Sequence, residues 1–158
     1  MVDDDLIAVH ERPVWKERAN FLVHIDLHPW GLPGRLEQLW VRREGERLFE
    51  LCCIPFFSYG FHLGDVVETT PQNDLEFVVN RVVSPSGRRN IRIAVINPDD
   101  AELITKRLEV ECENLCCPYE VCRPGYMAID LPSPNHERVL LTAINDLLQS
   151  RAIMMEEV

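Results

Sequence analysis

The segment of residues 49–68, FELCCIPFFSYGFHLGDVVE, constrains the fold more than any other part of the sequence. It is the densest apolar run of the chain, and Pro55, Gly60 and Gly64 interrupt it at short intervals. Proline cannot donate to a strand ladder, and glycine supplies backbone conformations that tight turns require. The pattern predicts a buried strand, an aromatic-lined turn and a second strand, with the flanking segments packed around them.

The composition is that of a folded globular protein. The 158 residues are 46% hydrophobic and 27% charged, which suits one ordinary domain or two very small ones. No apolar run approaches the roughly 18 residues of a membrane-spanning helix, and the N-terminal MVDDDLIAVHERP is acidic where a signal peptide is basic. We therefore expect a cytoplasmic protein with no membrane partner, whose six cysteines are reduced thiols.

The charge balance bears on the kind of partner. Sixteen Lys and Arg against 26 Asp and Glu give a net charge of −10. Phosphate contacts depend on cationic side chains, so this charge argues against a nucleic-acid partner and favours encounter with a basic protein surface. The alternative is an acidity without a specific role, since many cytosolic enzymes have a similar isoelectric point.

The first half of the chain predicts antiparallel strands separated by turns rich in Gly, Pro, Asn and Asp. The expected strands are residues 21–26, 36–43, 48–54, 65–70 and 75–83, with turns at 28–34, 44–46 and 71–74. We expect residues 1–20 to be a loose polar lead-in. Residues 21–87 should form an antiparallel β half, either a small sheet or a partial barrel.

After residue 87 the pattern changes to mixed helix and strand. The run of Asn, Pro, Asp and Asp at 97–100 is a typical helix start, and Ser133 with Pro134 opens a second helix. Strands are expected at residues 90–96, 119–122, 126–131 and, as an edge strand, 152–156. This β-α-β-β-α-β order predicts a ferredoxin-like half over residues 88–158. The fold class is therefore α+β, with both halves in one compact unit.

Four cysteines, Cys112, Cys116, Cys117 and Cys122, fall within eleven residues and are weak candidates for a metal site. Zinc sites use paired thiolates two to four residues apart, and only the first two cysteines could form such a pair. The alternative is that they are small apolar residues at a helix end and on a strand. We expect no metal and no cofactor.

Two further pairs of candidate ligands occur in predicted strands. His24 and His28 flank Asp26, and residues four apart share one face of a strand, so the two imidazoles could meet. Without a third ligand, a surface or capping role is the preferred interpretation. Cys52 and Cys53 should point to opposite faces of their strand, so that at most one enters the core.

The turn in residues 55–65 offers a possible ligand pocket. Its candidate residues are Phe56, Phe57, Tyr59, Phe61, His62 and Asp65. His62 and Asp65 could form a general acid–base pair. The alternatives are that the aromatic rings plug the end of a barrel, and that Asp65 accepts hydrogen bonds from backbone N–H groups of its own turn. No common nucleotide-binding or hydrolase motif occurs, so we expect no catalytic residues.

Acidic residues gather on the first predicted helix and at its two ends. They are Asp99, Asp100, Glu102, Glu109, Glu111 and Glu113. They could be a docking surface for a basic partner, or simply a solvated helix face. The function we expect is that of a small acidic binding protein that docks a protein partner, possibly an immunity protein that neutralises the basic domain of a bacterial toxin. The alternative is a small-molecule-binding or enzymatic module with its pocket in residues 55–65.

The same central segment resembles a known family. The run Ile54, Pro55, Phe56, Phe57, followed by Gly60 and then by Gly64, Asp65, Val66 and Val67, is similar to the core of the bacterial family called domain of unknown function 4265. The resemblance extends over most of the chain after residue 35. It implies a shared fold and no particular activity.

Overall fold

The computed structural model describes residues 6–72 and 76–158. Contacts divide the chain into two compact units, Met1–Ser86 and Gly87–Val158, and each has its own hydrophobic core. The sequence placed this boundary one residue later. Residues 1–5 of the expected lead-in, the last two residues of the expected turn 71–74 and the first residue of the expected strand 75–83 lie outside the described residues.

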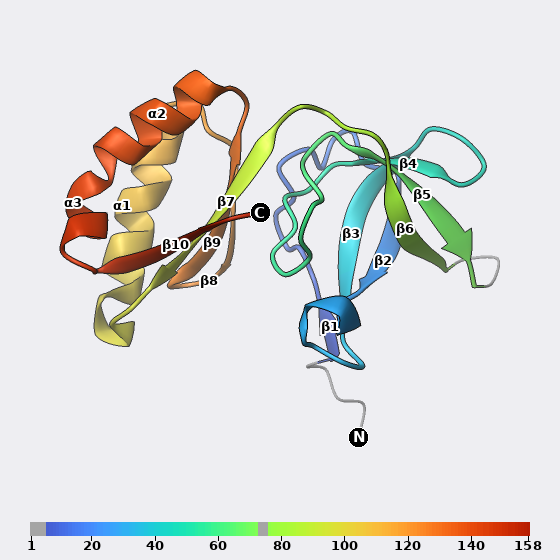
Figure 1. Ribbon diagram of the computed structural model, residues 1–158, viewed down its shortest axis with the longest axis horizontal. Coiled ribbons are helices and arrows are strands. Elements are labelled where there is room, and N and C mark those ends of the chain that lie inside the picture. Colours follow the sequence, from blue (N-terminus) through green and yellow to red (C-terminus); the bar gives the residue numbers. More distant parts are fainter. Residues whose placement is uncertain (1–5, 73–75) are drawn as a thin grey trace. The chain divides into compact units, whose positions relative to one another are not determined.

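The first unit contains a small closed barrel (Figure 1). Its strands are β2 (Phe21–Asp26), β3 (Leu36–Arg43), β4 (Leu48–Leu51), β5 (Val66–Pro71) and β6 (Phe77–Ser84). Each strand pairs antiparallel with the next, and β2 meets β6 in parallel at His24 and Val78. Five strands running alternately up and down leave the first and last strands pointing the same way, which is why the closing contact is parallel. The sequence predicted an antiparallel β half that is either a small sheet or a partial barrel; the structure has the antiparallel strands and closes them into a full barrel.

We expected residues 1–20 to be a loose lead-in, but the described part of this segment packs against the barrel. Strand β1 (Ile7–Ala8) pairs in parallel with the first residues of β3. His10 is buried, and the backbone N–H of Trp15 donates to the carbonyl of Cys52 at 3.0 Å. The polar composition hid these contacts, because they depend on one histidine and on backbone groups.

The second unit is the predicted ferredoxin-like half (Figure 1). Strands β7 (Arg89–Val95), β8 (Tyr119–Arg123), β9 (Tyr126–Leu131) and β10 (Ile153–Glu157) form an antiparallel sheet in the order β10-β7-β9-β8. One face carries α1 (Ala101–Asn114), α2 (Pro134–Ala143) and α3 (Asn145–Gln149). The α+β class is confirmed, and β10 is an edge strand as expected. None of the helices in the described residues is long and apolar enough to cross a membrane.

The helix starts follow the predicted capping residues. Asn97 accepts a hydrogen bond from the Asp99 N–H at 3.2 Å, and a 3-10 turn (Pro98–Asp100) leads into α1. Ser133 caps α2 by accepting the N–H of His136 at 3.4 Å. Beyond it, the single helix expected from the sequence is interrupted at Ile144, where α2 gives way to the short α3.

The two faces of the second sheet differ in chemistry. Alternate residues of β7 and β9 face the helices and are apolar, among them Ile91, Ile93, Met127 and Ile129. The residues between them point away from the helices, and several of them are buried polar groups. They are Asn90, Arg92, Glu120 and Asp130. Arg88 forms a bidentate ion pair with Asp130.

Helix α1 gives a test of this core. Leu108 is 1% exposed, whereas Leu103 on the same helix is 75% exposed. We expect Leu108→Ala to lower the free energy of unfolding of the second unit by about 2–5 kcal/mol, because it removes buried methyl groups and leaves a cavity. Leu103→Ala is the matched control and should change it by less than about 0.5 kcal/mol. Urea unfolding followed by circular dichroism measures both, and equal effects would contradict this assignment of the core.

Candidate functional site

The loop of residues 52–65, which we call the β4–β5 loop, is largely buried although it lies between two strands. Cys52, Cys53, Ile54 and Leu63 have no exposed surface. The expectation that at most one of the two cysteines enters the core is wrong, because β4 ends at Leu51 and the alternation of strand faces ends with it. The loop therefore forms part of the interior of its unit.

One carboxylate holds the backbone of this loop in place. Oε1 of Glu37 accepts the N–H of Phe56 at 2.5 Å, and Oε2 accepts the N–H groups of Phe57 and Ser58 at 3.1 and 3.2 Å. Oε1 also lies 2.9 Å from Nε2 of His10. Glu37 thus satisfies three backbone donors of a buried turn that no strand partner reaches.

The electrostatics of this cluster favour the ionised carboxylate. Burial by itself raises the pKa of Glu37, but the hydrogen bonds from His10 and from the backbone of Phe56 and Phe57 outweigh it, and the net pKa is below its ordinary value. The imidazole of His10 also stacks on the ring of Phe56, with centroids 4.3 Å apart and planes 4° from parallel. The arrangement is a fully engaged structural clamp.

The sequence contained a signal for Glu37 that pattern reasoning missed. Glu37 lies on the same face of β3 as Leu39 and Val41, both of which point into the barrel. A carboxylate on an apolar strand face must find hydrogen-bond donors or a counter-charge when it is buried. Its partner His10 lies in the supposed lead-in and could not be paired with it from spacing.

Asp65, a predicted site residue, has a structural role in the same loop. Its carboxylate accepts the N–H of His62 at 2.8 Å and the N–H of Ser86 at 2.7 Å. Burial raises the pKa of Asp65, but these bonds and the nearby His62 imidazole, 3.4 Å away, bring the net pKa below its ordinary value. The prediction that Asp65 accepts backbone hydrogen bonds of its turn is confirmed.

The aromatic candidates of this loop do not converge on one cavity. Phe56 is buried against His10, and its ring meets Phe57 edge to face. Phe61 packs into the barrel core and meets Trp30 edge to face, with ring centroids 6.3 Å apart. Tyr59 is 39% exposed, and its ring centroid lies 6.2 Å from that of Trp30. The side chains are thus divided between the clamp, the core and the surface.

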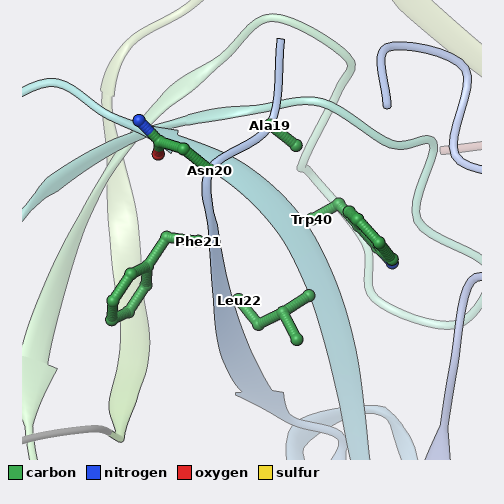
Figure 2. Close-up of a pocket in the computed structure, with 5 residues that line it drawn as sticks. All are labelled: Ala19, Asn20, Phe21, Leu22 and Trp40. Atoms are coloured by element: carbon green, nitrogen blue, oxygen red, sulfur yellow. The ribbon is translucent and has the colours of Figure 1, made fainter. Parts of the chain in front are cut away.

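A shallow hollow of about 370 Å³ lies elsewhere on the barrel, at the start of β2 (Figure 2). Leu22 and Trp40 are register partners and lie side by side on one face of their strands, whereas Phe21 points away on the other face. Ala19 and Asn20 complete the lining. Asn20 is engaged, because its side-chain oxygen accepts the N–H of Arg43 at 2.9 Å. The hollow contains no acid, thiol or imidazole, so its surface offers no acid–base or metal chemistry.

The predicted cysteine cluster does not come together as a metal site. Among the described residues, no group of three or more His, Cys, Asp or Glu side chains is placed to hold a metal ion. Cys112 and Cys117 are buried, Cys116 is exposed and Cys122 is half-buried. Burial raises the pKa of Cys117 to about 11 and raises that of Cys112 as well, so both are poor thiolates at neutral pH.

The histidines of the HIDLH run are also separated. Strand β2 ends at Asp26, and His28 already belongs to a 3-10 turn (His28–Trp30), so the two imidazoles do not share a strand face. Asp26 instead accepts the N–H of His28 at 2.9 Å, and the side chain of His28 is exposed. Burial lowers the pKa of His24.

The acidic residues of the second unit do form a surface. Asp99, Asp100, Glu102 and Glu113 are exposed, and Glu109 and Glu111 are half-buried. Two large apolar side chains stand among them, Leu103 and Val110, of which 75% and 53% are exposed. They are seven residues apart, which places them on the same side of α1 two turns apart. We call these six acidic residues, together with Leu103 and Val110, the α1 face.

The Glu37 clamp gives a prediction with a defined pH dependence. Glu37→Gln removes the charge and turns an amide N–H₂ toward backbone donors, so we expect the free energy of unfolding at pH 7 to fall by about 3 kcal/mol. The pKa of Glu37 is lowered in the folded state. Its contribution is therefore complete above the unfolded pKa and is lost as the pH falls through the folded pKa, so the difference should shrink below about pH 4.

The control for this substitution is Glu46→Gln, at an exposed residue of the β3–β4 turn. It changes the same charge, and we expect less than about 0.5 kcal/mol at any pH. Urea unfolding at a series of pH values measures both variants. A difference between Glu37→Gln and the parent that stays constant down to pH 2 would show that charge is not what the clamp uses.

The different exposure of the cysteines predicts which thiol of the cluster reacts first. We expect one fast thiol in the folded protein, Cys116, because it is exposed while Cys112 and Cys117 are buried and poorly ionised. Labelling with an aromatic disulfide reagent, followed by absorbance, should lose its fast phase in Cys116→Ser. Cys122→Ser is the control. A fast phase that survives Cys116→Ser would contradict this order of reactivity.

Comparison with known proteins gives the family and the fold. The family described as domain of unknown function (DUF4265) matches residues 37–154. A solved structure titled as a novel crystal structure of a hypothetical protein from Neisseria gonorrhoeae is similar to this chain. It has 17% sequence identity and a TM-score of 0.65, over 86% of this chain and 92% of that one. None of the curated proteins compared with the chain matches it. The family predicted from the sequence of the β4–β5 loop is therefore confirmed, and the chain belongs to the DUF4265 family.

Proposed function

We propose that this is a binding protein that docks a basic protein partner on the α1 face. The observation that carries the proposal is the pair Leu103 and Val110, two exposed apolar side chains on one side of a helix that carries more acidic than basic residues. Surface leucines alone need no explanation, but paired apolar residues ringed by charge match the organisation of an interface, with an apolar centre and a polar rim.

The charges of α1 leave an acidic surplus. Lys106 lies 3.6 Å from Glu109, and Arg107 forms a bidentate pair with Asp146 at 2.6 and 2.7 Å. Both basic residues of the helix are thus already close to acids. A negative field of this kind speeds the encounter with a cationic surface and suppresses acidic competitors.

The more specific form of the proposal is an immunity protein whose partner is the basic domain of a bacterial toxin. It is supported by the small size, by the net charge of −10 and by the acidic surplus on α1 and at its two ends. A tight complex with a nuclease-like basic domain would use the charges for association rate and the apolar pair for residence time.

The alternative, a ligand or enzyme site in residues 55–65, has less support from the geometry. Asp65 accepts two backbone N–H groups and Glu37 accepts three. Carboxylates engaged in this way hold a loop, and moving a proton through them would release the loop from its supports.

Site-specific crosslinking in living cells tests the proposal. A photoreactive residue in place of Leu103 should give one dominant adduct with a protein of high isoelectric point, identified by mass spectrometry. The yield of this adduct should fall as the salt concentration rises, because the steering charges are solvent-exposed. The same group in place of Glu46, on the exposed turn of the barrel unit, is the control.

The purified partner then allows a quantitative check. We expect Leu103→Ser combined with Val110→Ser to weaken binding by at least about tenfold, since each buried apolar side chain contributes about 1.5–3 kcal/mol. Identical adducts from positions 103 and 46, or a partner whose affinity ignores both substitutions, would refute docking on the α1 face.

A further inference from the structure

A second feature of the same unit is a hollow between helix α1 and the β8–β9 hairpin, which we call the β8 hollow. It has a volume of about 400 Å³. It is lined by four residues of α1 and two of the hairpin, namely Glu102, Thr105, Lys106, Glu109, Val121 and Pro124. The β8 hollow therefore borders the α1 face and shares two carboxylates with it.

Strand β8 is an edge of its sheet, and part of its backbone points outward. β8 is last in the order β10-β7-β9-β8. The N–H of Asp130 donates to the carbonyl of Pro118 at 2.8 Å, in the register of the β8–β9 pair. Hydrogen-bonding direction alternates along an antiparallel strand, so Glu120 bonds to β9 while the N–H and C=O groups of Tyr119 and Val121 point outward. Among the described residues, no backbone hydrogen bond uses these outward groups.

The side chains beside this edge face the β8 hollow. Val121 is the register partner of Met127, which packs against the helices, so Val121 lies on the same face of the sheet. It is half-buried and lines the hollow. A strand added at the outer edge would continue the pleat, so its residue opposite Val121 would also point to this face, into the hollow.

The α1 wall of the hollow carries more negative than positive charge. Glu102 is exposed, and within the described parts of the chain its carboxylate has no ion pair. Lys106 lies 3.6 Å from Glu109, which is longer than a hydrogen bond, and its side chain is 83% exposed. Two carboxylates against one ammonium group, beside the apolar surface of Val121 and Pro124, suit a long cationic side chain.

We propose that the partner adds an extended segment to the outer edge of β8, with an arginine or lysine opposite Val121. The backbone of the segment exchanges hydrogen bonds with Tyr119 and Val121. The stem of the basic side chain lies over Val121 and Pro124, and its cationic head reaches Glu102 and Glu109. The segment belongs to the basic partner proposed for the α1 face, so this inference rests on that proposed function.

The geometry favours an extended basic segment over other occupants. A helix satisfies its own backbone groups and would leave those of Tyr119 and Val121 without partners. A second copy of β8 would continue the sheet and bring a second acidic α1 toward Glu102 and Glu109. An acidic segment would meet the same repulsion.

Short synthetic peptides test this proposal on the full-length protein. The probe is Val-Thr-Arg-Thr-Val with a neutral fluorophore at its N-terminus and an amide at its C-terminus, followed by fluorescence anisotropy. Its β-branched residues favour an extended strand, and arginine is its only charge. We expect it to bind at least about tenfold more tightly than the same peptide with glutamate in place of arginine.

Backbone methylation separates strand addition from charge attraction. In the added strand the N–H of the arginine points to β8, and the N–H of the following threonine points away from it. N-methylation of the arginine should weaken binding at least about tenfold, whereas N-methylation of that threonine is the control and should change it less than about twofold. Binding should also slow amide hydrogen exchange at Tyr119 and Val121.

Two matched sets of variants locate the site on the protein. Val121→Pro removes an outward N–H and spares the hydrogen bonds to β9, so it should abolish binding, whereas Val121→Ala keeps that N–H and should retain it. Glu102→Gln with Glu109→Gln should weaken the arginine peptide about tenfold. Glu11→Gln with Glu46→Gln removes the same charge from exposed residues of the first unit and should change binding less than about twofold. Circular dichroism melts establish that each variant is folded.

The inference fails if the arginine peptide does not bind up to about 1 mM protein, a weak-binding limit. It also fails if the two N-methylated peptides bind equally, or if the two double variants have equal effects, because then no strand is added or only net charge matters. A partner adduct from position 103 without peptide binding would refute strand addition and leave docking on the α1 face intact. Peptide binding without that adduct would support the β8 edge and refute the docking proposal.

Discussion

The barrel unit depends on one buried carboxylate. The β4–β5 loop runs through the interior of its unit without a strand partner, and Glu37 supplies the acceptors for three consecutive backbone donors, at Phe56, Phe57 and Ser58. A buried charge is costly unless it is paired and hydrogen-bonded. Here that cost is offset by His10 and by the loop itself, so the carboxylate, the lead-in and the loop stabilise one another.

On the face of the second sheet that points away from the helices, buried charges are paired with side chains of opposite charge. Arg88 and Asp130 form a bidentate pair, which closes both groups to further partners of that geometry. Arg92 and Glu156 meet at a longer distance, at an edge strand and beside a hollow. In each pair one partner is buried, Asp130 in the first and Arg92 in the second, and the other partner is partly exposed.

The strands, the caps at Asn97 and Ser133 and the ferredoxin-like order could be predicted because each depends on residues near one another in sequence. The role of Asp65 could be predicted for the same reason. The clamp could not, because His10 and Glu37 are 27 residues apart and only the closed barrel brings them together.

The segment that identifies the family, the β4–β5 loop, differs from the surface that we propose for binding, the α1 face. The β4–β5 loop carries the family resemblance, yet its carboxylates Glu37 and Asp65 are occupied by backbone donors. Carboxylates that are engaged by the backbone in this way serve the fold, because removing them would leave buried N–H groups without acceptors. The exposed α1 face lies in Gly87–Val158, where local patterns mark a common fold and say little about ligands. Partner and ligand specificity are therefore expected to vary with the residues of the second unit, while the loop stays as the scaffold requires.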